Sequence, residues 1–273
     1  MIQIESPALS VEILPEVGGK VGQIHDKLCC RSLLVPPQRA YRTIPVDGNW
    51  LMHDISGMDD CFPNVAAGDY PEHPWTGAQL PDLGEWTHGI WRIVNAGQRE
   101  IDMERAGGTL PYLASKALRL VDDRILELSY RVENHGRFPI RYLWSAHPLI
   151  SVEDDYELVL PTGNLTFNTF PPDGRTYDWP LFDGRCLSRE WIRHGTTLKV
   201  FITGLTEGWC ELRLPTHTLR FVFDVNIVPV LGIWLNNFGF PARGGRAFRC
   251  VAVEPCTSRS DLLHDLDQRA SAN

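Results

Sequence analysis

The sequence predicts an all-β protein that forms one domain over residues 1–273. Twenty prolines and 23 glycines interrupt the chain at short intervals, which leaves little room for long helices. Between these breaks, apolar residues alternate with polar ones, as in strands that bury one face. Many short strands at a spacing of roughly 8–12 residues, with little helix between them, favour a β-sandwich or a β-barrel.

Three segments show the strand pattern most clearly. Residues 126–132 place four apolar side chains on one face, and residues 219–224 alternate in the same way. Residues 227–235 are apolar on both faces, which is typical of a strand that is covered on both sides. Serines and leucines in residues 258–266 predict a short C-terminal helix. Turn-forming residues occur at 134–136, 172–174, 182–184 and 243–246.

Composition and charge exclude several classes of partner. A net charge of −8 and a pI near 5.6 argue against binding to nucleic acid or to an anionic membrane surface. The sequence has no run of 18 apolar residues, and its acidic N-terminal stretch does not resemble a signal peptide. Seven cysteines without a C-x-x-C spacing indicate reduced, mostly buried thiols. We therefore expect a cytoplasmic protein.

Glu254 is the first candidate for a chemical role. It ends an apolar strand predicted for residues 248–254, on the same face as Phe248, Cys250 and Ala252. Burial without a partner raises the pKa of a carboxyl group and makes the group a candidate general base near neutral pH. The alternative is a glutamate at a frayed strand end that points into water.

His147 is the second candidate, among the apolar residues 141–153. It directly precedes Pro148, as Glu254 precedes Pro255, and a residue before proline favours an extended backbone. Because the ordinary pKa of histidine lies near neutral pH, a histidine held in this way suits a proton donor. The alternative is a structural histidine whose two ring nitrogens find partners in the core.

A third group of candidates is polar and aromatic. Asp60 and Asn64 belong to the stretch D-D-C-F-P-N, which reads as a polar loop, and His88 stands between two tryptophans. Indole rings beside polar groups suit sugar binding, because the C–H faces of a sugar stack on rings and its hydroxyls need hydrogen bonds. Both tryptophans are also compatible with the core. Asn236 or Asn237 could reach a ligand or cap a turn.

Several residues have metal-ligating side chains, but none has a recognised metal-ligand spacing. His53 and Asp54 add to the acids and histidines above, yet H-x-H, H-E-x-x-H and zinc-type cysteine pairs are absent. A carboxylate-rich site for a hard cation stays open. Nucleotide-binding glycine motifs and the G-x-S-x-G motif of serine hydrolases are also absent. No recognised motif therefore assigns a metal or a cofactor to this chain.

Taken in order, these segments resemble the galactose mutarotase-like (aldose 1-epimerase-like) superfamily over most of the chain. The resemblance implies a β-supersandwich of two large, mostly antiparallel sheets, with an open cleft across one concave sheet. Each motif is short, and their order along the chain makes the set specific. The motifs are V-G-G-K-V-G-Q-I-H-D at residues 17–26, C-F-P-N at 61–64, T-H-G-I-W at 87–91, Y-R-V-E-N at 130–134, W-S-A-H-P at 144–148 and V-A-V-E-P at 251–255.

The resemblance also implies a mechanism and a sugar substrate. Glu254 would take the proton from the anomeric C1 hydroxyl, while His147 would donate one to the ring oxygen. The ring would open to the aldehyde and close again as the other anomer. His88 would hydrogen-bond the ring oxygen or a neighbouring hydroxyl, and Trp234 would stack on the sugar. Asp60, Asn64 and Asn236 are the remaining substrate-binding candidates, and the protein would be a monomer or a homodimer.

The chain departs from the family pattern, which leaves alternatives open. The loop after Pro63 lacks the usual arginine, and only His88 matches the usual pair of histidines. One alternative is a non-catalytic carbohydrate-binding protein. Another is an epimerase or lyase for an acidic sugar, which would need a cationic group such as Arg141 or Arg246.

Overall fold

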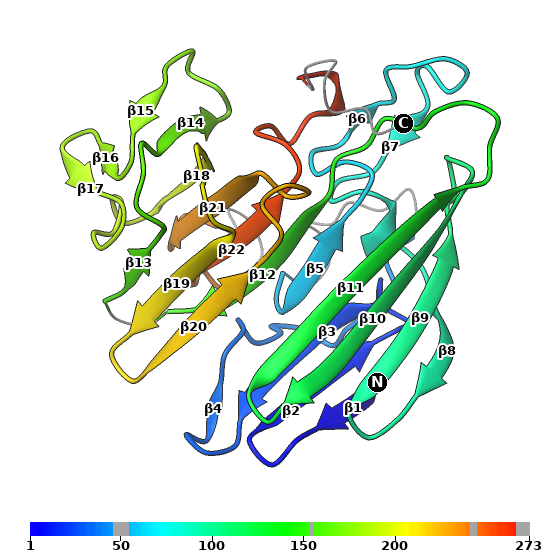
Figure 1. The fold of residues 1–273 in the computed structure, drawn as a ribbon, viewed down its shortest axis with the longest axis horizontal. Coiled ribbons are helices and arrows are strands. Elements are labelled where there is room, and N and C mark those ends of the chain that lie inside the picture. Colours follow the sequence, from blue (N-terminus) through cyan, green and yellow to red (C-terminus); the bar gives the residue numbers. More distant parts are fainter. Residues whose placement is uncertain (46–54, 153–154, 241–244, 266–273) are drawn as a thin grey trace. The chain divides into compact units, whose positions relative to one another are not determined.

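The computed structural model describes residues 1–45, 55–152, 155–240 and 245–265, and its regular elements are almost all β-strands (Figure 1). In these residues helix occurs only as two short 3-10 segments, η2 (Glu85–Thr87) and η3 (Leu263–Asp265). The all-β prediction is confirmed. The chain divides into two compact units, Met1–Trp144 with Leu262–Asn273 and Ser145–Asp261. A single domain over residues 1–273 stays a prediction.

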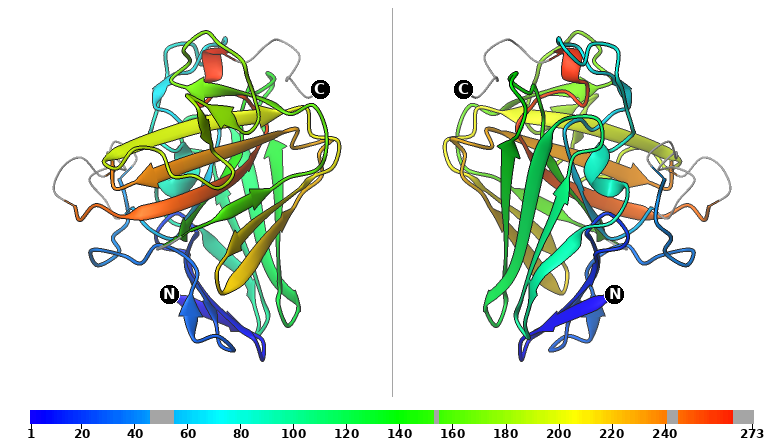
Figure 2. Two further views of the ribbon diagram at one scale, coloured as in Figure 1. Left: turned by 90° about the vertical axis from the view of Figure 1, so that its left-hand side faces the viewer. Right: turned by 90° about the vertical axis from the view of Figure 1, so that its right-hand side faces the viewer.

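The first unit contains two antiparallel sheets and a hairpin, β6 with β7. The first sheet has the order β1-β2-β3-β5, with β4 beside β3, and the second has the order β11-β10-β9-β8. The green arrows of the second sheet run side by side in the right-hand view of Figure 2. The strands are β1 (Ile2–Glu5), β2 (Leu9–Leu14), β3 (Lys20–Asp26), β4 (Arg31–Ser32), β5 (Met58–Cys61), β6 (Gly68–Asp69), β7 (Gln79–Leu80), β8 (Arg92–Ala96), β9 (Glu100–Ala106), β10 (Tyr112–Asp122) and β11 (Ile125–Asn134).

The second unit contains six antiparallel strands of one large sheet, in the order β12-β22-β21-β18-β14-β15. A smaller sheet has the order β13-β19-β20, and β16 pairs with β17. Three neighbouring strands of the large sheet, β18, β21 and β22, appear in yellow to orange in the left-hand view of Figure 2. The strands are β12 (Ser145–Ser151), β13 (Glu157–Val159), β14 (Thr166–Phe170), β15 (Tyr177–Asp178), β16 (Leu181–Phe182), β17 (Arg185–Cys186), β18 (Thr196–Thr203), β19 (Trp209–Leu214), β20 (His217–Val222), β21 (Val230–Asn237) and β22 (Arg249–Cys256).

Apolar alternation locates these strands well. The pattern at 126–132 becomes β11, and the pattern at 219–224 becomes β20 with its end moved back to Val222. The doubly apolar segment becomes β21, which is buried on both faces as predicted. It starts at Val230 and not at 227, because the amides of Ile227 and Val228 turn back to the carbonyl of Asp224.

Two local predictions need correction. The stretch at Asp60, predicted as a polar loop, begins as the fully buried strand β5, because Lys20 from β3 and Lys116 from β10 pair with its two aspartates. The predicted C-terminal helix is represented by η3 alone, and Leu266 lies outside the described residues. No described helix has both the length and the apolar character that a membrane span requires.

Candidate functional site

In the second unit, the register of β12 against β22 sets His147 opposite Glu254. Cross-strand pairs occur at Ser145↔Cys256 and at Leu149↔Ala252, so the central pair of this antiparallel run is His147 with Glu254. Both residues are followed by proline, which has no backbone N–H. The prolines therefore remove hydrogen-bond donors from the two strands beside the two side chains.

The Glu254 carboxylate makes different contacts through its two oxygen atoms. Oε1 lies 3.7 Å from His147 Nε2 and accepts no hydrogen bond from the described residues. Oε2 lies 2.9 Å from Lys199 Nζ and accepts a long hydrogen bond of 3.4 Å from Ser145 Oγ. The Glu254 side chain is 0% exposed, and that of His147 is 8% exposed. Lys199 and Ser145 thus bind Oε2, and Oε1 faces the His147 imidazole.

The charge state of Glu254 differs from the expectation that burial alone would raise its pKa. Burial does act in that direction, but the interactions with Lys199 and then His147 outweigh it, and hydrogen bonds from Lys199 and Ser145 add to their effect. The net result is a pKa below the ordinary glutamate value, so the sequence-based expectation is wrong in sign. The reason is a lysine that pattern analysis did not identify as a partner.

Lys199 is the residue of the candidate site that sequence reasoning missed. Its Nζ lies 2.9 Å from Glu254 and 2.8 Å from Asp261 Oδ1, and its side chain is 10% exposed. Burial acts to lower the pKa of Lys199, but the interactions with Asp261 and then Glu254 outweigh it. The net pKa lies above the ordinary lysine value, so the ammonium stays charged. Burial raises the pKa of Asp261 above its ordinary value, and Glu254 adds to this effect against the opposing effect of Lys199. Asp261 is 62 residues from Lys199 in the chain, so no local motif links them.

Neighbouring side chains shape the space around His147 and Glu254. Gly232 on β21 lies directly opposite Glu254, and a Cβ built there would be 3.1 Å from Glu254 Cβ. The half-buried Trp234 lies two residues further along, with its ring 6.0 Å from that of His147. The packing therefore depends on a glycine behind the carboxylate and sets an indole beside the imidazole.

Asn236, on the same strand, is committed to the protein backbone. Its amide donates to the carbonyls of Phe240 and Phe248, and its Oδ1 accepts from the amides of Gly239 and Phe240. These four bonds use the whole hydrogen-bonding capacity of the carboxamide. In this structure Asn236 therefore holds the segment after β21, and a contact with a ligand stays a prediction.

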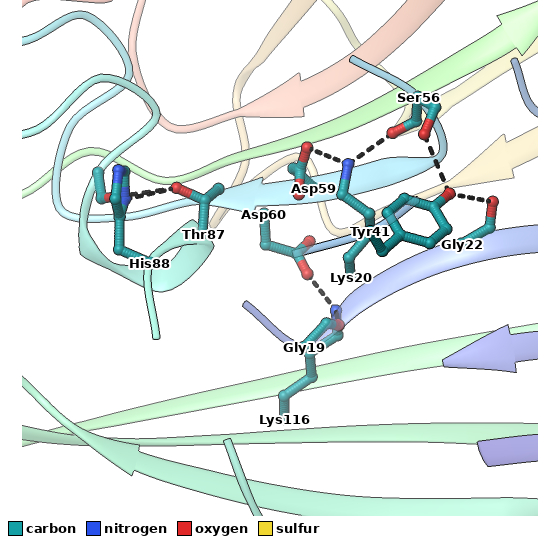
Figure 3. Close-up of polar contacts among 11 residues, drawn as sticks. Gly19, Lys20, Gly22, Tyr41, Ser56, Asp59, Asp60, Thr87, His88 and Lys116 are labelled. Atoms are coloured by element: carbon teal, nitrogen blue, oxygen red, sulfur yellow. Dashed lines mark hydrogen bonds and ion pairs between the residues drawn. The ribbon is translucent and has the colours of Figure 1, made fainter. Parts of the chain in front are cut away.

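The first unit contains Asp60 in a buried network of two lysine–aspartate pairs (Figure 3). Lys116 Nζ contacts Asp60 Oδ2 and donates to the Gly19 carbonyl, while the Tyr130 hydroxyl donates to Asp60 Oδ1 over 2.7 Å. Lys20 pairs with Asp59 at 2.8 Å. Burial raises the pKa of Tyr130 well above its ordinary value, and the negative charge of Asp60 adds to this effect. These contacts link β5 to strands of both sheets of this unit.

His88 and Asn64 lie on neighbouring segments of the same unit. His88 is fully buried, and its Nδ1 bonds the Gly84 carbonyl and the Thr87 hydroxyl, each over 2.9 Å (Figure 3). Asn64 donates to the carbonyls of Ala66 and Pro81, while its buried Oδ1 accepts nothing from the described residues. Sugar binding by His88, Asp60 and Asn64 stays a prediction.

Other candidates have structural partners. The tryptophans on either side of His88 are both buried in the core, which confirms the core interpretation. Arg141 pairs with Glu72 over 2.7 Å. In the described ranges no three histidine, cysteine or acidic residues cluster in a way that could hold a metal ion, and His53 and Asp54 lie outside those ranges. Four of the seven cysteines are buried, and all seven are free thiols.

Comparison with known proteins identifies the fold. No family model and no curated protein matches this chain. Solved structures do: the Slr1438 protein of Synechocystis sp. PCC 6803 has 13% identity and a TM-score of 0.72 over 96% of this chain and 86% of that chain. A galactose mutarotase-like protein of Lactobacillus casei has 17% identity and a TM-score of 0.69 over 94% and 87%. A galactose mutarotase related enzyme of Lactobacillus acidophilus has 13% identity and a TM-score of 0.65 over 93% and 84%.

Proposed function

We propose that this protein interconverts the anomers of an aldose, with Glu254 as general base and His147 as general acid. The observation that carries the proposal is the contact between His147 Nε2 and Glu254 Oε1 at 3.7 Å. That carboxylate oxygen accepts no hydrogen bond from the described residues, although the side chain is fully buried. Its neighbour Oε2 is held by Lys199. A carboxylate oxygen that accepts no hydrogen bond and lies beside an imidazole suits proton transfer.

The geometry fits the chemistry of a hemiacetal. The C1 hydroxyl and the ring oxygen share one carbon atom, so two proton-transferring atoms near each other can serve both. Glu254 Oε1 takes the hydroxyl proton, His147 Nε2 gives a proton to the ring oxygen, and the bond from C1 to the ring oxygen breaks. After rotation about the C1–C2 bond, His147 takes back the proton, Glu254 returns one to O1, and the ring closes. Each positioned group contributes roughly 10²–10⁴-fold to the rate.

The fold and the neighbouring indole support a sugar as the substrate. Solved structures with this fold include galactose mutarotase-like proteins. Trp234 is half-buried beside His147 and gives a flat apolar surface for the C–H face of a sugar ring. An acidic sugar has less support, because the cationic candidate Arg141 already pairs with Glu72. A neutral aldose is therefore the substrate class that we favour.

One observation favours a second function, sugar binding without catalysis. Glu254 is fully buried and ion-paired, which is also what a structural glutamate requires. A binding protein needs the indole and hydrogen-bonding groups but no proton transfer. The two functions differ in a single measurable property, the rate of anomer exchange.

Magnetisation-exchange NMR of a panel of aldoses, uronates and sugar phosphates tests the proposal. Wild type is expected to accelerate anomer exchange of an aldose, and Glu254→Gln and His147→Asn are each expected to abolish most of that acceleration. The matched control is an exposed pair of the same types, His135 and Glu133, whose ring nitrogen and carboxylate lie 3.6 Å apart. His135→Asn and Glu133→Gln should leave the rate unchanged. Sugar line broadening without faster exchange would favour the binding protein and refute the mutarotase.

A further inference from the structure

A line of charged groups extends beyond the acid–base pair into the second unit. His147 Nε2 lies 3.7 Å from Glu254, whose second oxygen lies 2.9 Å from Lys199 Nζ, which in turn lies 2.8 Å from Asp261. Lys199 comes from β18, Glu254 from β22 and Asp261 from the segment after β22. Three separate parts of the chain therefore meet at the Lys199 ammonium.

The position of Lys199 is set by the sheet. It pairs with Trp234 across β18 and β21, and Trp234 pairs with Ala252 on β22, two residues before Glu254. Side chains two residues apart on a strand share a face, so Lys199, Trp234 and Glu254 share one face of the sheet. The lysine approaches Oε2 and leaves Oε1 facing His147. Its stem also places the ammonium 5.3 Å from the centre of the Phe201 ring.

We propose that Lys199 and Asp261 are positioning residues, which fix the Glu254 carboxylate in place and keep it charged with one oxygen open to His147. This inference rests on the proposed function, because it concerns the base of that reaction. Neither residue needs to touch the sugar. Lys199 acts through Oε2, and Asp261 limits the action of Lys199 by sharing its ammonium between two carboxylates.

The arrangement balances two demands on a catalytic base. A lysine paired only with Glu254 would hold the carboxylate charged but would weaken it as a base, since a strongly stabilised anion takes up protons poorly. Asp261 draws part of the lysine charge to itself, and its own pKa is raised by burial and then by Glu254. The carboxylate is thus kept ionised without being fully neutralised.

Other titratable groups near Glu254 do not change charge near neutral pH. Burial raises the pKa of Cys256 to about 12 and that of Cys250 well above its ordinary value, and the negative charge of Glu254 adds to this effect in both thiols. The remaining partner of the carboxylate is the Ser145 hydroxyl, which does not titrate in this range. His147, Lys199 and Asp261 are therefore the remaining titratable groups around Glu254 in the described structure.

The test is a titration of Glu254 that needs no substrate. In full-length protein labelled with glutamate carrying ¹³C at the carboxyl carbon, the Glu254 signal is assigned by its loss in Glu254→Gln. Its midpoint is then measured in wild type, Lys199→Met, Lys199→Arg and Asp261→Asn. The midpoint should rise by about 1–3 pH units in Lys199→Met, stay low in Lys199→Arg and fall below wild type in Asp261→Asn. Lys27→Met, at a surface ion pair with Glu5, is the control and should move nothing.

The pH profile of anomer exchange supplies the second readout. The acidic limb of kcat/KM should move in the same direction as the Glu254 midpoint in each variant, with KM nearly unchanged. A purely structural role would lower the rate without moving the limb. If Lys199→Met does not fold, the downward shift in Asp261→Asn decides the question.

The two possible failures are distinguishable. An unmoved Glu254 midpoint in folded Lys199→Met or Asp261→Asn, in a protein that does exchange anomers, would refute the positioning role and leave the function standing. A shifted midpoint in a protein that exchanges no sugar would refute the function while supporting the control of Glu254 by Lys199 and Asp261.

Discussion

The glycine opposite the candidate base offers the sharpest test of the site geometry. In Gly232→Ala the new Cβ would lie 3.1 Å from Glu254 Cβ, 3.3 Å from its carbonyl oxygen and 3.5 Å from Oε2. Optimal contacts between carbon atoms lie at about 3.5–4.0 Å, so the carbon–carbon contact is about 0.4 Å too short. Because Glu254 is fully buried and Lys199 holds its Oε2, the strain falls on the position of the carboxylate.

The expected magnitudes follow from this overlap. Overpacking in a core costs about 1–3 kcal/mol, and the lower entropy of the unfolded alanine chain returns about 0.4–1 kcal/mol. The free energy of unfolding should therefore fall by about 1–2 kcal/mol. A misplacement of about 1 Å can cost roughly 100-fold in rate, so a shift of a few tenths of an ångström should lower kcat about 10-fold.

The assay compares Gly232→Ala with Gly68→Ala. A Cβ at Gly68 on β6 meets no atom within 4 Å, and its backbone does not require glycine. Urea unfolding and anomer-exchange rates are measured for both variants. If Gly232→Ala were as stable and as active as Gly68→Ala, Glu254 would not depend on the space that the glycine leaves, and the reasoning would fail.

Three further predictions concern buried charges and thiols. Lys116→Met should lower the free energy of unfolding by about 3–5 kcal/mol, because Asp60 is left charged and buried. Lys27→Met, which removes a half-exposed ion pair with Glu5, should lower it by at most about 1 kcal/mol, and urea melts of the two variants compare these losses. The pKa of Glu254 is lower in the folded protein than in the unfolded chain, where it is about 4.3, so the ionised carboxylate stabilises the fold above that pH. The stability advantage of wild type over Glu254→Gln should therefore vanish as the pH falls through the folded value. Urea melts of both proteins between about pH 3 and about pH 7 measure this difference. A thiol reagent at neutral pH should modify the exposed Cys29 and Cys30 first, while Cys210 and Cys256, whose pKa burial raises to about 12, should react only on unfolding; fast labelling of either buried thiol in the folded protein would contradict their burial.

Much of the fold could be predicted from the sequence because alternation is a local signal. Each strand pattern depends on residues two apart, and the patterns that became β11, β20 and β21 were visible within a few residues. The error at β5 has a physical cause. Two adjacent aspartates indicate a solvent-exposed loop unless cations accompany them into the core, and those cations, Lys20 and Lys116, are 39 and 56 residues away.

The candidate site was predictable only in part, for a related reason. His147 and Glu254 stood out because each is a polar residue in an apolar strand, and the structure brings them together. Lys199 did not stand out, since a lysine in a strand usually faces solvent. Its burial depends on Glu254, which reaches it through strand pairing, and on Asp261 from the segment after β22. Register and long-range ion pairs are set by tertiary packing and leave no spacing in the sequence to detect.

The buried lysine–carboxylate pairs of the two units differ in their charge balance, and this difference bears on which unit carries chemistry. In the first unit two lysines meet two aspartates, so each carboxylate has its own cation and the network is balanced. In the second unit one lysine serves both Glu254 and Asp261, which leaves one negative charge in excess. A proton on His147 would balance that charge, and passing the proton through a substrate to Glu254 would leave the total at zero. A cluster that stays neutral across a proton transfer needs little reorganisation during it, which is what a buried acid–base catalyst requires.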